Sequence, residues 1–308
     1  MSIFLKQTVI LAKLETTKGT DSAPTGAANA MLVSNVSFTP LEGDEVEREV
    51  IRPYFGDSGS AMVTQYCKLS FDVEFAGVAV PGSEPGYADL LRACACDVTV
   101  TAGTDVTFAP ISQDLDSVTL YINIGGNRQK IMAGMANCKI DAPAKSLPKL
   151  QFEFWGTYQA AVSEPLPSVD YTAFEQPLGV NASNTSLTLH GTTVAASAFS
   201  FDMGLTVVKR DLINVNTVEI TGRKSSGSVT FDNTLVSEKN WTELARTATS
   251  GALTLRHGTG GSNIVELNAN KVQLGKPAFA DSDGIQQITV PLRFIPTSGN
   301  DEWEIVVR

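Results

Sequence analysis

The residue types that usually carry catalysis or bind metals are scarce in this chain. Its 308 residues include two histidines, His190 and His257, and four cysteines. Neither histidine belongs to a pattern of acidic or cysteine residues that would build a general base or a metal site. We therefore expect both histidines to be ordinary strand or turn residues.

The cysteines, Cys67, Cys94, Cys96 and Cys138, all lie in the first half of the chain. Cys94 and Cys96 fall on a predicted helix, where side chains two residues apart point in different directions. Buried apolar thiols are therefore expected rather than a zinc site. The first residues lack the pattern of a secretory signal, which favours a reduced, cytoplasmic setting over a disulfide framework. No apolar stretch is long enough for a membrane span, so no membrane partner is expected.

Two short segments imitate catalytic loops. Gly56-Asp-Ser-Gly-Ser60 is similar to the nucleophile loop of serine proteases, but no histidine precedes Ser58 and Ser60 replaces the final glycine. Gly258-Thr-Gly-Gly-Ser262 is rich in glycine but leads into a predicted strand, not into the helix N-terminus that binds phosphate. Both segments are predicted turns. The chain is predicted not to be an enzyme and to need no cofactor.

The composition is that of a folded acidic protein. There are 33 acidic against 23 basic residues, a net charge of −10, and 43% hydrophobic residues. The sequence pI is about 4.8 and the mean hydropathy is +0.02. This excludes a disordered chain. It also argues against a protein that grips nucleic acid through its phosphates, since such proteins normally carry a basic surface.

Apolar residues alternate with polar ones along several segments, which predicts a mainly β fold of the sandwich or barrel type. The pattern covers residues 67–75, 150–154, 199–207 and 288–294. Acidic residues occur on the other face of these strands and of the strand ending at 232, and they are Asp72, Glu74, Glu153, Asp202 and Asp232. Ordinary solubility and a shared, wet negative surface are both compatible with this pattern.

Helical spacing predicts amphipathic helices over residues 85–96 and 237–248, the second with Gly251 as a stop signal. These helices expose an internal repeat. Around each, the same elements recur in the same order: a strand ending in Phe-Asp, a helix, a strand, a glycine hairpin at 125–127 or 260–262, and a final strand. We predict two tandem units, 1–164 and 187–308, joined by a linker rich in Pro, Ser, Asn and Gly at 165–186.

Each unit contains a long segment between its first two core strands, at 41–64 and 209–227. Loops of this length in a folded domain are usually functional or mobile. The first is also the densest acidic patch of the chain.

Several segments resemble the tail tube (major tail) proteins of long-tailed bacteriophages. They are residues 11–24 and 30–40, the loop through Glu47, Arg48, Tyr54 and Phe55, the strand at 68–75, and the helix at 85–93. The resemblance is clearest over residues 1–160. In the second half it depends on the internal repeat.

The resemblance implies β-sandwich or barrel units, each with one flanking helix, whose sheets join into rings that stack into a hollow, DNA-conducting tube. The usual ring has six single-unit subunits, so two units per chain imply a trimer with pseudo-sixfold symmetry. The expected partners are other copies of the chain and the tape-measure, tail terminator and tail-tip proteins. Phage DNA is expected to pass without sequence-specific binding. The expected location is the virion tail, assembled in the host cytoplasm.

Within that resemblance, the five strand carboxylates become candidates for the lumen, since an acidic lining repels phosphates. The two long segments become candidates for the loops that reach the neighbouring ring. Their candidate residues are Glu42, Asp44, Glu45, Glu47, Arg48, Glu49, Arg52, Tyr54, Lys209, Arg210, Arg223 and Lys224. The alternative hypothesis is a tandem β-sandwich binding module, an adhesin or a carbohydrate-binding decoration protein, which predicts a concave aromatic platform.

Overall fold

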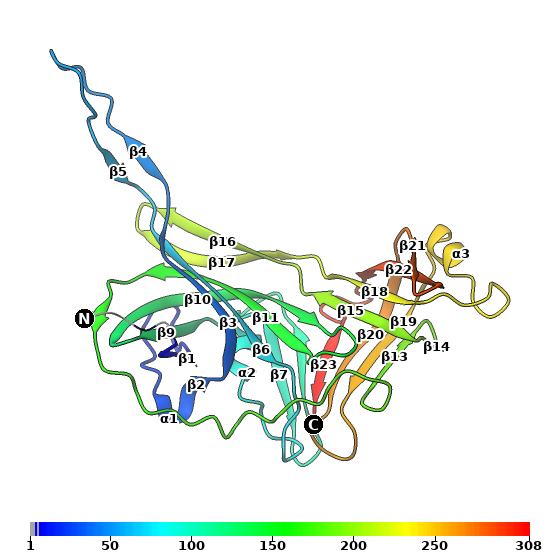
Figure 1. Cartoon of the computed structure of the whole chain (residues 1–308). Coiled ribbons are helices and arrows are strands. Elements are labelled where there is room, and N and C mark those ends of the chain that lie inside the picture. The colour runs from blue at the N-terminus through cyan, green and yellow to red at the C-terminus, as the bar shows by residue number, and fades with distance from the viewer. Residues whose placement is uncertain (1–3, 5) are drawn as a thin grey trace.

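Strands form most of the regular structure in the computed structural model, which describes residue 4 and residues 6–308 (Figure 1). This confirms the predicted mainly β fold. The helices are α1 (Gly26–Asn29), α2 (Ala88–Arg92) and α3 (Trp241–Arg246). In the described part of the chain, no helix is long and apolar enough to cross a membrane.

The first half has two layers of antiparallel strands that share one long strand. The strands are β1 (Thr8–Leu14), β2 (Ala30–Met31), β3 (Val33–Glu42), β6 (Tyr66–Glu74), β9 (Val118–Ile124), β10 (Asn127–Asp141), β11 (Lys149–Tyr158) and β12 (Val162–Ser163). One layer has the order β2-β1-β9-β10 and the other β3-β6-β11-β10. The beginning of β10 also pairs with β12. Strand β10 serves both layers because an irregularity between Met132 and Met135 bends it.

The second half pairs its strands in the same order. They are β13 (Thr185–Leu189), β14 (Thr192–Thr193), β15 (Ala196–Asp202), β18 (Ser226–Asp232), β19 (Ser250–His257), β20 (Val265–Leu274), β21 (Ala278–Ser282), β22 (Ile285–Phe294) and β23 (Glu304–Val307). Its layers are β14-β13-β19-β20 and β15-β18-β22-β20, and β23 pairs with the beginning of β20. This common order is compatible with tandem units. The boundaries at 164 and 187 stay a prediction.

Two strand pairings join the halves. Strand β15 pairs with the end of β10, with Ile140 opposite Phe201, and we call this contact the internal junction. Strand β23 pairs with β8 (Asp105–Pro110), which itself pairs with β7 (Cys96–Thr101). One antiparallel sheet therefore crosses the molecule in the order β3-β6-β11-β10-β15-β18-β22-β21. A single connected core contains buried residues of both halves.

The two long segments are hairpins rather than irregular loops. Strands β4 (Glu45–Glu47) and β5 (Ser60–Met62) form a narrow ribbon, the projecting arm, which points away from the molecule (Figure 1). Strands β16 (Leu205–Leu212) and β17 (Val215–Arg223) form the docked arm. It runs from the second half back over the first and contacts β10 and β11 (Figure 1).

Three details of the sequence prediction are wrong. Residues 199–207 do not form one strand, because β15 ends at Asp202 and Gly204 takes a φ of 67°, where an added Cβ would lie 2.1 Å from the Lys224 carbonyl oxygen. Both predicted helices exist but are shorter, and Ala248 (φ 55°), not Gly251, follows the end of α3. Cys96 begins β7 and is not helical.

Candidate functional site

The side of the eight-strand sheet that faces away from the core carries most of the predicted acidic residues, and we call it the polar face. On β6, Asp72 and Glu74 alternate with buried Phe71 and Val73. The Asp72 carboxylate accepts a hydrogen bond from Asn35 Nδ2 at 2.6 Å and lies 3.2 Å from Lys149 Nζ. Its side chain is 13% exposed, so this acid is partly neutralised and partly covered.

The remaining acidic candidates lie on three other strands of this sheet. Glu153, on β11, is exposed and accepts a hydrogen bond from Trp155 Nε1 at 3.3 Å. Asp202, on β15, accepts from Asn137 Nδ2 at 2.8 Å and pairs with Lys139 at 3.3 Å across the internal junction. Asp232 ends β18 and accepts from Gln287 Nε2 at 3.0 Å.

The structure therefore brings these acids onto one continuous surface, but with lysines between them. Lys139 and Lys149 on the polar face were not among the sequence candidates, and neither was Asp141. The alternation of Asn137, Lys139 and Asp141 with buried Cys138 and Ile140 is the sequence signal that could have found them. Burial raises the pKa of Asp141, and the neighbouring Asp72 carboxylate raises it further.

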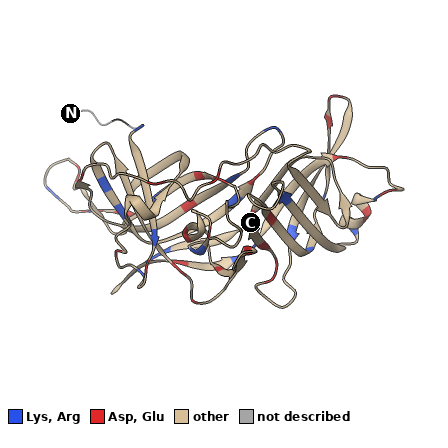
Figure 2. Cartoon of the chain, turned by 90° about the horizontal axis from the view of Figure 1, so that it is seen from below, with Lys and Arg blue, Asp and Glu red and all other residues tan. Residues whose placement is uncertain are grey.

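Two shallow hollows of about 290 and 320 Å³ lie side by side on the polar face and share Lys139 and Gln151. The first is lined by Asp72 and Glu153 and the second by Asp141 and Asp202, so the hollows meet at the internal junction. Seen over the whole chain, acidic and basic residues are interspersed rather than separated (Figure 2). The polar face is of mixed charge, with more acidic than basic strand residues.

The projecting arm carries the candidate residues of the first long segment. Glu42 ends β3, and Asp44 and Glu45 are hydrogen-bonded to Thr64 and Ser60 at its base. The acidic and basic candidates Glu47, Arg48, Glu49 and Arg52 are exposed, and Arg52 lies 5.9 Å from the ring centre of Tyr54. In the same segment, the side chains of Ile51 and Phe55 are fully exposed, at 104% and 107%. Large apolar side chains so exposed on an arm are typical of a contact surface.

The docked arm is held by contacts within the chain. Val218 is fully buried, and Glu219 pairs with Lys18 of the first half at 2.8 Å. Arg223 donates to Glu302, to the Ile111 carbonyl oxygen at 2.8 Å and to Asn300 at 2.9 Å. Arg223 is thus an internal anchor, whereas Arg210 and Lys224 are exposed.

The remaining candidate on the docked arm is Lys209, and the tip of this arm lies between β16 and β17. Burial lowers the pKa of Lys209, whose ammonium contacts Asn216 and lies 3.9 Å from Asp211. At the tip, Leu212 and Ile213 are 56% and 93% exposed. Both arms therefore end in exposed apolar residues, although only the projecting arm is free along its length in the described structure.

The histidines, the cysteines and the Gly56–Ser60 segment have structural roles in the folded chain. His190 Nε2 lies 2.8 Å from the Val272 carbonyl oxygen, His257 Nδ1 lies 2.8 Å from Thr185 Oγ1, and burial lowers the pKa of both rings. The four cysteines are free and buried. Within the described residues there is no cluster of three or more potential metal ligands. In the Gly56–Ser60 segment, Gly59 N donates to Asp57 Oδ1 at 2.7 Å, as in a turn.

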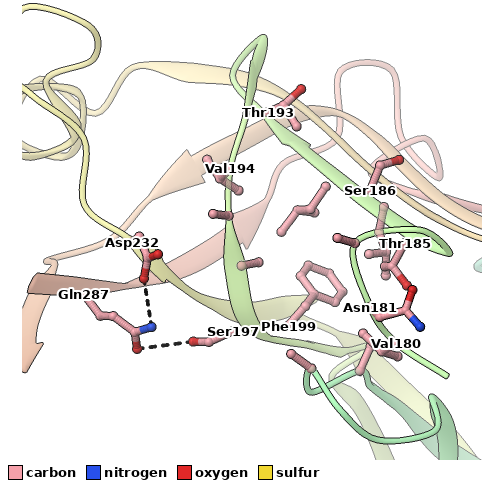
Figure 3. Close-up of a pocket in the computed structure, with 17 residues that line it drawn as sticks. Val180, Asn181, Thr185, Ser186, Thr193, Val194, Ser197, Phe199, Asp232 and Gln287 are labelled. Carbon is pink, nitrogen blue, oxygen red and sulfur yellow. Dashed lines mark hydrogen bonds between the residues drawn. The ribbon is translucent and has the colours of Figure 1, made fainter. Parts of the chain in front are cut away.

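In the part of the chain that the structure describes, we consider one pocket and the tryptophan side chains as possible ligand sites. A pocket of about 520 Å³ is lined mainly by apolar and small residues, most of them from the second half, with Ala142 and Ala144 from the first (Figure 3). At one end Gln287 bridges Asp232 and Ser197, so these polar groups satisfy one another. Trp241 and Trp303 are buried, and Trp155 stacks on Tyr66 at 5.3 Å under the Lys68 ammonium. This arrangement does not favour the predicted carbohydrate platform.

A comparison with protein-family models matches residues 6–295 to the phage tail tube protein family. A search of curated proteins finds no match. The matched span covers both halves of the chain and both arms. The family is a structural family of the phage tail and not an enzyme family, and membership implies self-association and contact with other tail components. The chain therefore belongs to the phage tail tube protein family.

Proposed function

We propose that this protein assembles into closed rings that stack into the hollow tail tube through which phage DNA is delivered. The observation that carries the proposal is the eight-strand sheet, in which four strands of the first half are followed by four strands of the second. A head-to-tail contact that continues this order builds a ring if its rotation closes. Three copies would supply six four-strand units, giving a trimer with pseudo-sixfold symmetry.

In this proposal the polar face lines the lumen. Its acids, Asp72, Glu74, Glu153, Asp202 and Asp232, repel DNA phosphates, while the lysines among them keep the repulsion moderate. The tape-measure protein would occupy this channel before DNA does, and terminator and tip proteins would close its ends. The arms extend from the ring and contact the neighbouring ring through their exposed apolar tips.

Electron microscopy of the purified protein at high concentration tests the proposal. Rings with threefold or pseudo-sixfold symmetry, or tubes made of them, are expected. Persistent monomers, even in the presence of the tape-measure and terminator proteins, would reject the proposed function. Glycan binding by such a monomer would favour the binding-module alternative instead.

Reversing the charge of Asp72 and Glu74 to lysine is expected to slow DNA release several-fold while rings still form. Each added lysine on the lumen attracts phosphates at short range, where salt screens the interaction least. Release is measured by dye fluorescence on phage that carry the variant, at two salt concentrations. The control reverses Asp97 and Glu238, which are exposed but lie outside the polar face. Equal release rates for the two variants would remove Asp72 and Glu74 from the lumen.

A further inference from the structure

The two arms begin in the same way in the two halves, but only one of them is docked. At the base of each arm lies a glycine, Gly43 or Gly204, where an added Cβ would lie 1.9 or 2.1 Å from a carbonyl oxygen at the other end of the arm. The residue before this carbonyl group is Val63 in the projecting arm and Arg223 in the docked arm. Val63 is 53% exposed, whereas the side chain of Arg223 is 12% exposed. The two arms therefore differ at one corresponding position of their bases.

The Arg223 guanidinium joins the docked arm to both halves. It donates to Glu302 and to Asn300 Oδ1 of the second half, and to the carbonyl oxygen of Ile111, which follows β8 in the first half. Ser112 Oγ of the first half also donates to Asn300 Oδ1, at 2.7 Å. A guanidinium can serve several acceptors at once, because its N–H groups point in fixed and different directions. One side chain thus holds the arm and both halves at a single point.

This anchor is an ion pair that is largely removed from water. The side chain of Glu302 is 7% exposed, and its second oxygen, Oε2, is buried without a hydrogen-bond partner in the described chain. Removing the guanidinium would leave a buried and uncompensated carboxylate, which is far less favourable than the loss of an exposed ion pair. We therefore expect the arm and Glu302 to leave their positions together.

Residues 300–308, which we call the clasp, connect this anchor to the pairing between the halves. Trp303 Nε1 donates to Ser225 Oγ, just after the docked arm, at 2.9 Å. The following residues form β23, which lies between β8 of the first half and β20 of the second. Ile305 and Val307 of β23 are fully buried. The same short segment therefore fixes the base of the docked arm and one of the two strand pairings between the halves.

The described part of the first half offers no counterpart of this anchor. Strand β12 pairs with the beginning of β10, as β23 pairs with the beginning of β20. Residues 159–163, which lead into β12 and form it, contain no charged side chain. Val63 has no group that could bind a carboxylate. The clasp therefore accounts for the difference between the projecting arm and the docked arm.

We propose that the clasp couples the docking of the second arm to the pairing of the two halves, so that this arm docks only while β23 lies between β8 and β20. The proposal goes beyond the proposed ring, because it concerns a single chain and holds whether or not rings form. Such coupling is reciprocal, so the docked arm also stabilises the position of β23. A chain with an open clasp would have two projecting arms instead of one.

The variant Arg223→Val tests the anchor, because it gives the docked arm the residue of the projecting arm. Trypsin cleaves after lysine and arginine in segments that open locally, so its rate at each site reports how often that arm is free. Cleavage after Arg48 of the projecting arm is expected to be fast in the wild type and in the variant. Cleavage after Lys209 and Arg210 of the docked arm should be slow in the wild type and at least roughly tenfold faster in the variant.

Two further variants separate the anchor from a general effect of charge. Glu302→Gln keeps the shape of the side chain but removes its charge, and should speed cleavage of the docked arm by a smaller factor than Arg223→Val. The matched control is Lys224→Val, which removes the charge of an exposed neighbour of Arg223 and should be cleaved like the wild type. A docked arm that stays equally protected in Arg223→Val would overturn the proposal, since other contacts would then hold it.

Hydrogen exchange of the same variants, at a concentration where the chain is monomeric, tests the coupling. Arg223→Val is expected to raise exchange in the docked arm, β23 and β8 more than in β6 and β11. A released arm with unchanged exchange in β23 and β8 would show an anchor without coupling and overturn the proposal. An equal rise in all strands would show general destabilisation and overturn it as well. None of these results depends on whether rings form, so the proposed function is tested separately.

Discussion

Replacing Ile51 and Phe55 with serine is expected to abolish tubes and leave single rings. These side chains lie between β4 and β5 of the projecting arm and are fully exposed, so no part of the described chain packs on them. Burying a large apolar side chain against a neighbouring ring contributes roughly 1.5–3 kcal/mol. This contribution is lost at every projecting arm of the ring. The contact between rings should therefore be lost while the contacts within each ring remain. Electron microscopy and light scattering would separate rings from tubes.

The matched control is Leu235→Ser/Val236→Ser, which removes two apolar side chains that are 69% and 72% exposed but lie before α3, away from the arms. This variant is expected to form tubes. Because exposed positions rarely affect folding by more than about 0.5 kcal/mol, both variants should unfold like the wild type. Tubes of normal length from the Ile51/Phe55 variant would show that another surface joins the rings.

The strands were the most predictable part of this molecule. In β6, one face is buried and the other is wet, so the alternation of residues 67–75 directly reports the fold. The same reason explains β11 and β22. The hairpin glycines Gly125 and Gly126 were equally clear, because both adopt positive φ, at 53° and 99°. Local pattern was sufficient for these strands and turns, because one-sided burial and positive φ are properties of the segment itself.

The pairings between the halves could not be predicted from local pattern. The contact of β10 with β15 joins residues about sixty positions apart, and nothing in either strand's alternation identifies its partner. The continued alternation through Met203 and Leu205 even concealed the turn at Gly204. For the same reason, the alternation indicated on which side of their strands the acids lie but did not reveal the lysines beside them, since ion pairs such as Lys149–Asp72 depend on register.

The buried hydrogen bonds of Glu15 could not be predicted from local pattern either. Glu15 was not singled out in the sequence, yet its carboxylate accepts hydrogen bonds from Ser117, Thr119, Gly19 and Ala133, at 2.6–2.9 Å. It fastens the segment after β1 onto β9 and β10. Its partners lie up to 118 positions away, so only the folded structure brings them together.

Phe201→Ala is expected to destabilise the whole chain rather than its second half alone. The ring is 1% exposed and contacts Phe294 and Trp303, with centroid distances of 4.8 and 5.4 Å. Removing such a side chain costs about 3–5 kcal/mol. Phe201 also lies at the internal junction opposite Ile140, so the cavity opens where the cores of the two halves meet. Urea unfolding at low protein concentration would measure the loss.

Hydrogen exchange decides whether that loss is shared, because it reports on each strand separately. If the two cross-half pairings make the chain one cooperative unit, β6 and β11 of the first half should lose protection together with β18 and β22. The control, Phe55→Ala, removes the same side chain from a fully exposed position and should change neither half. Loss of protection confined to the second half would mean that the halves fold independently. The internal junction would then be a docking contact between two finished units, and the contact proposed between copies could form and separate in the same way.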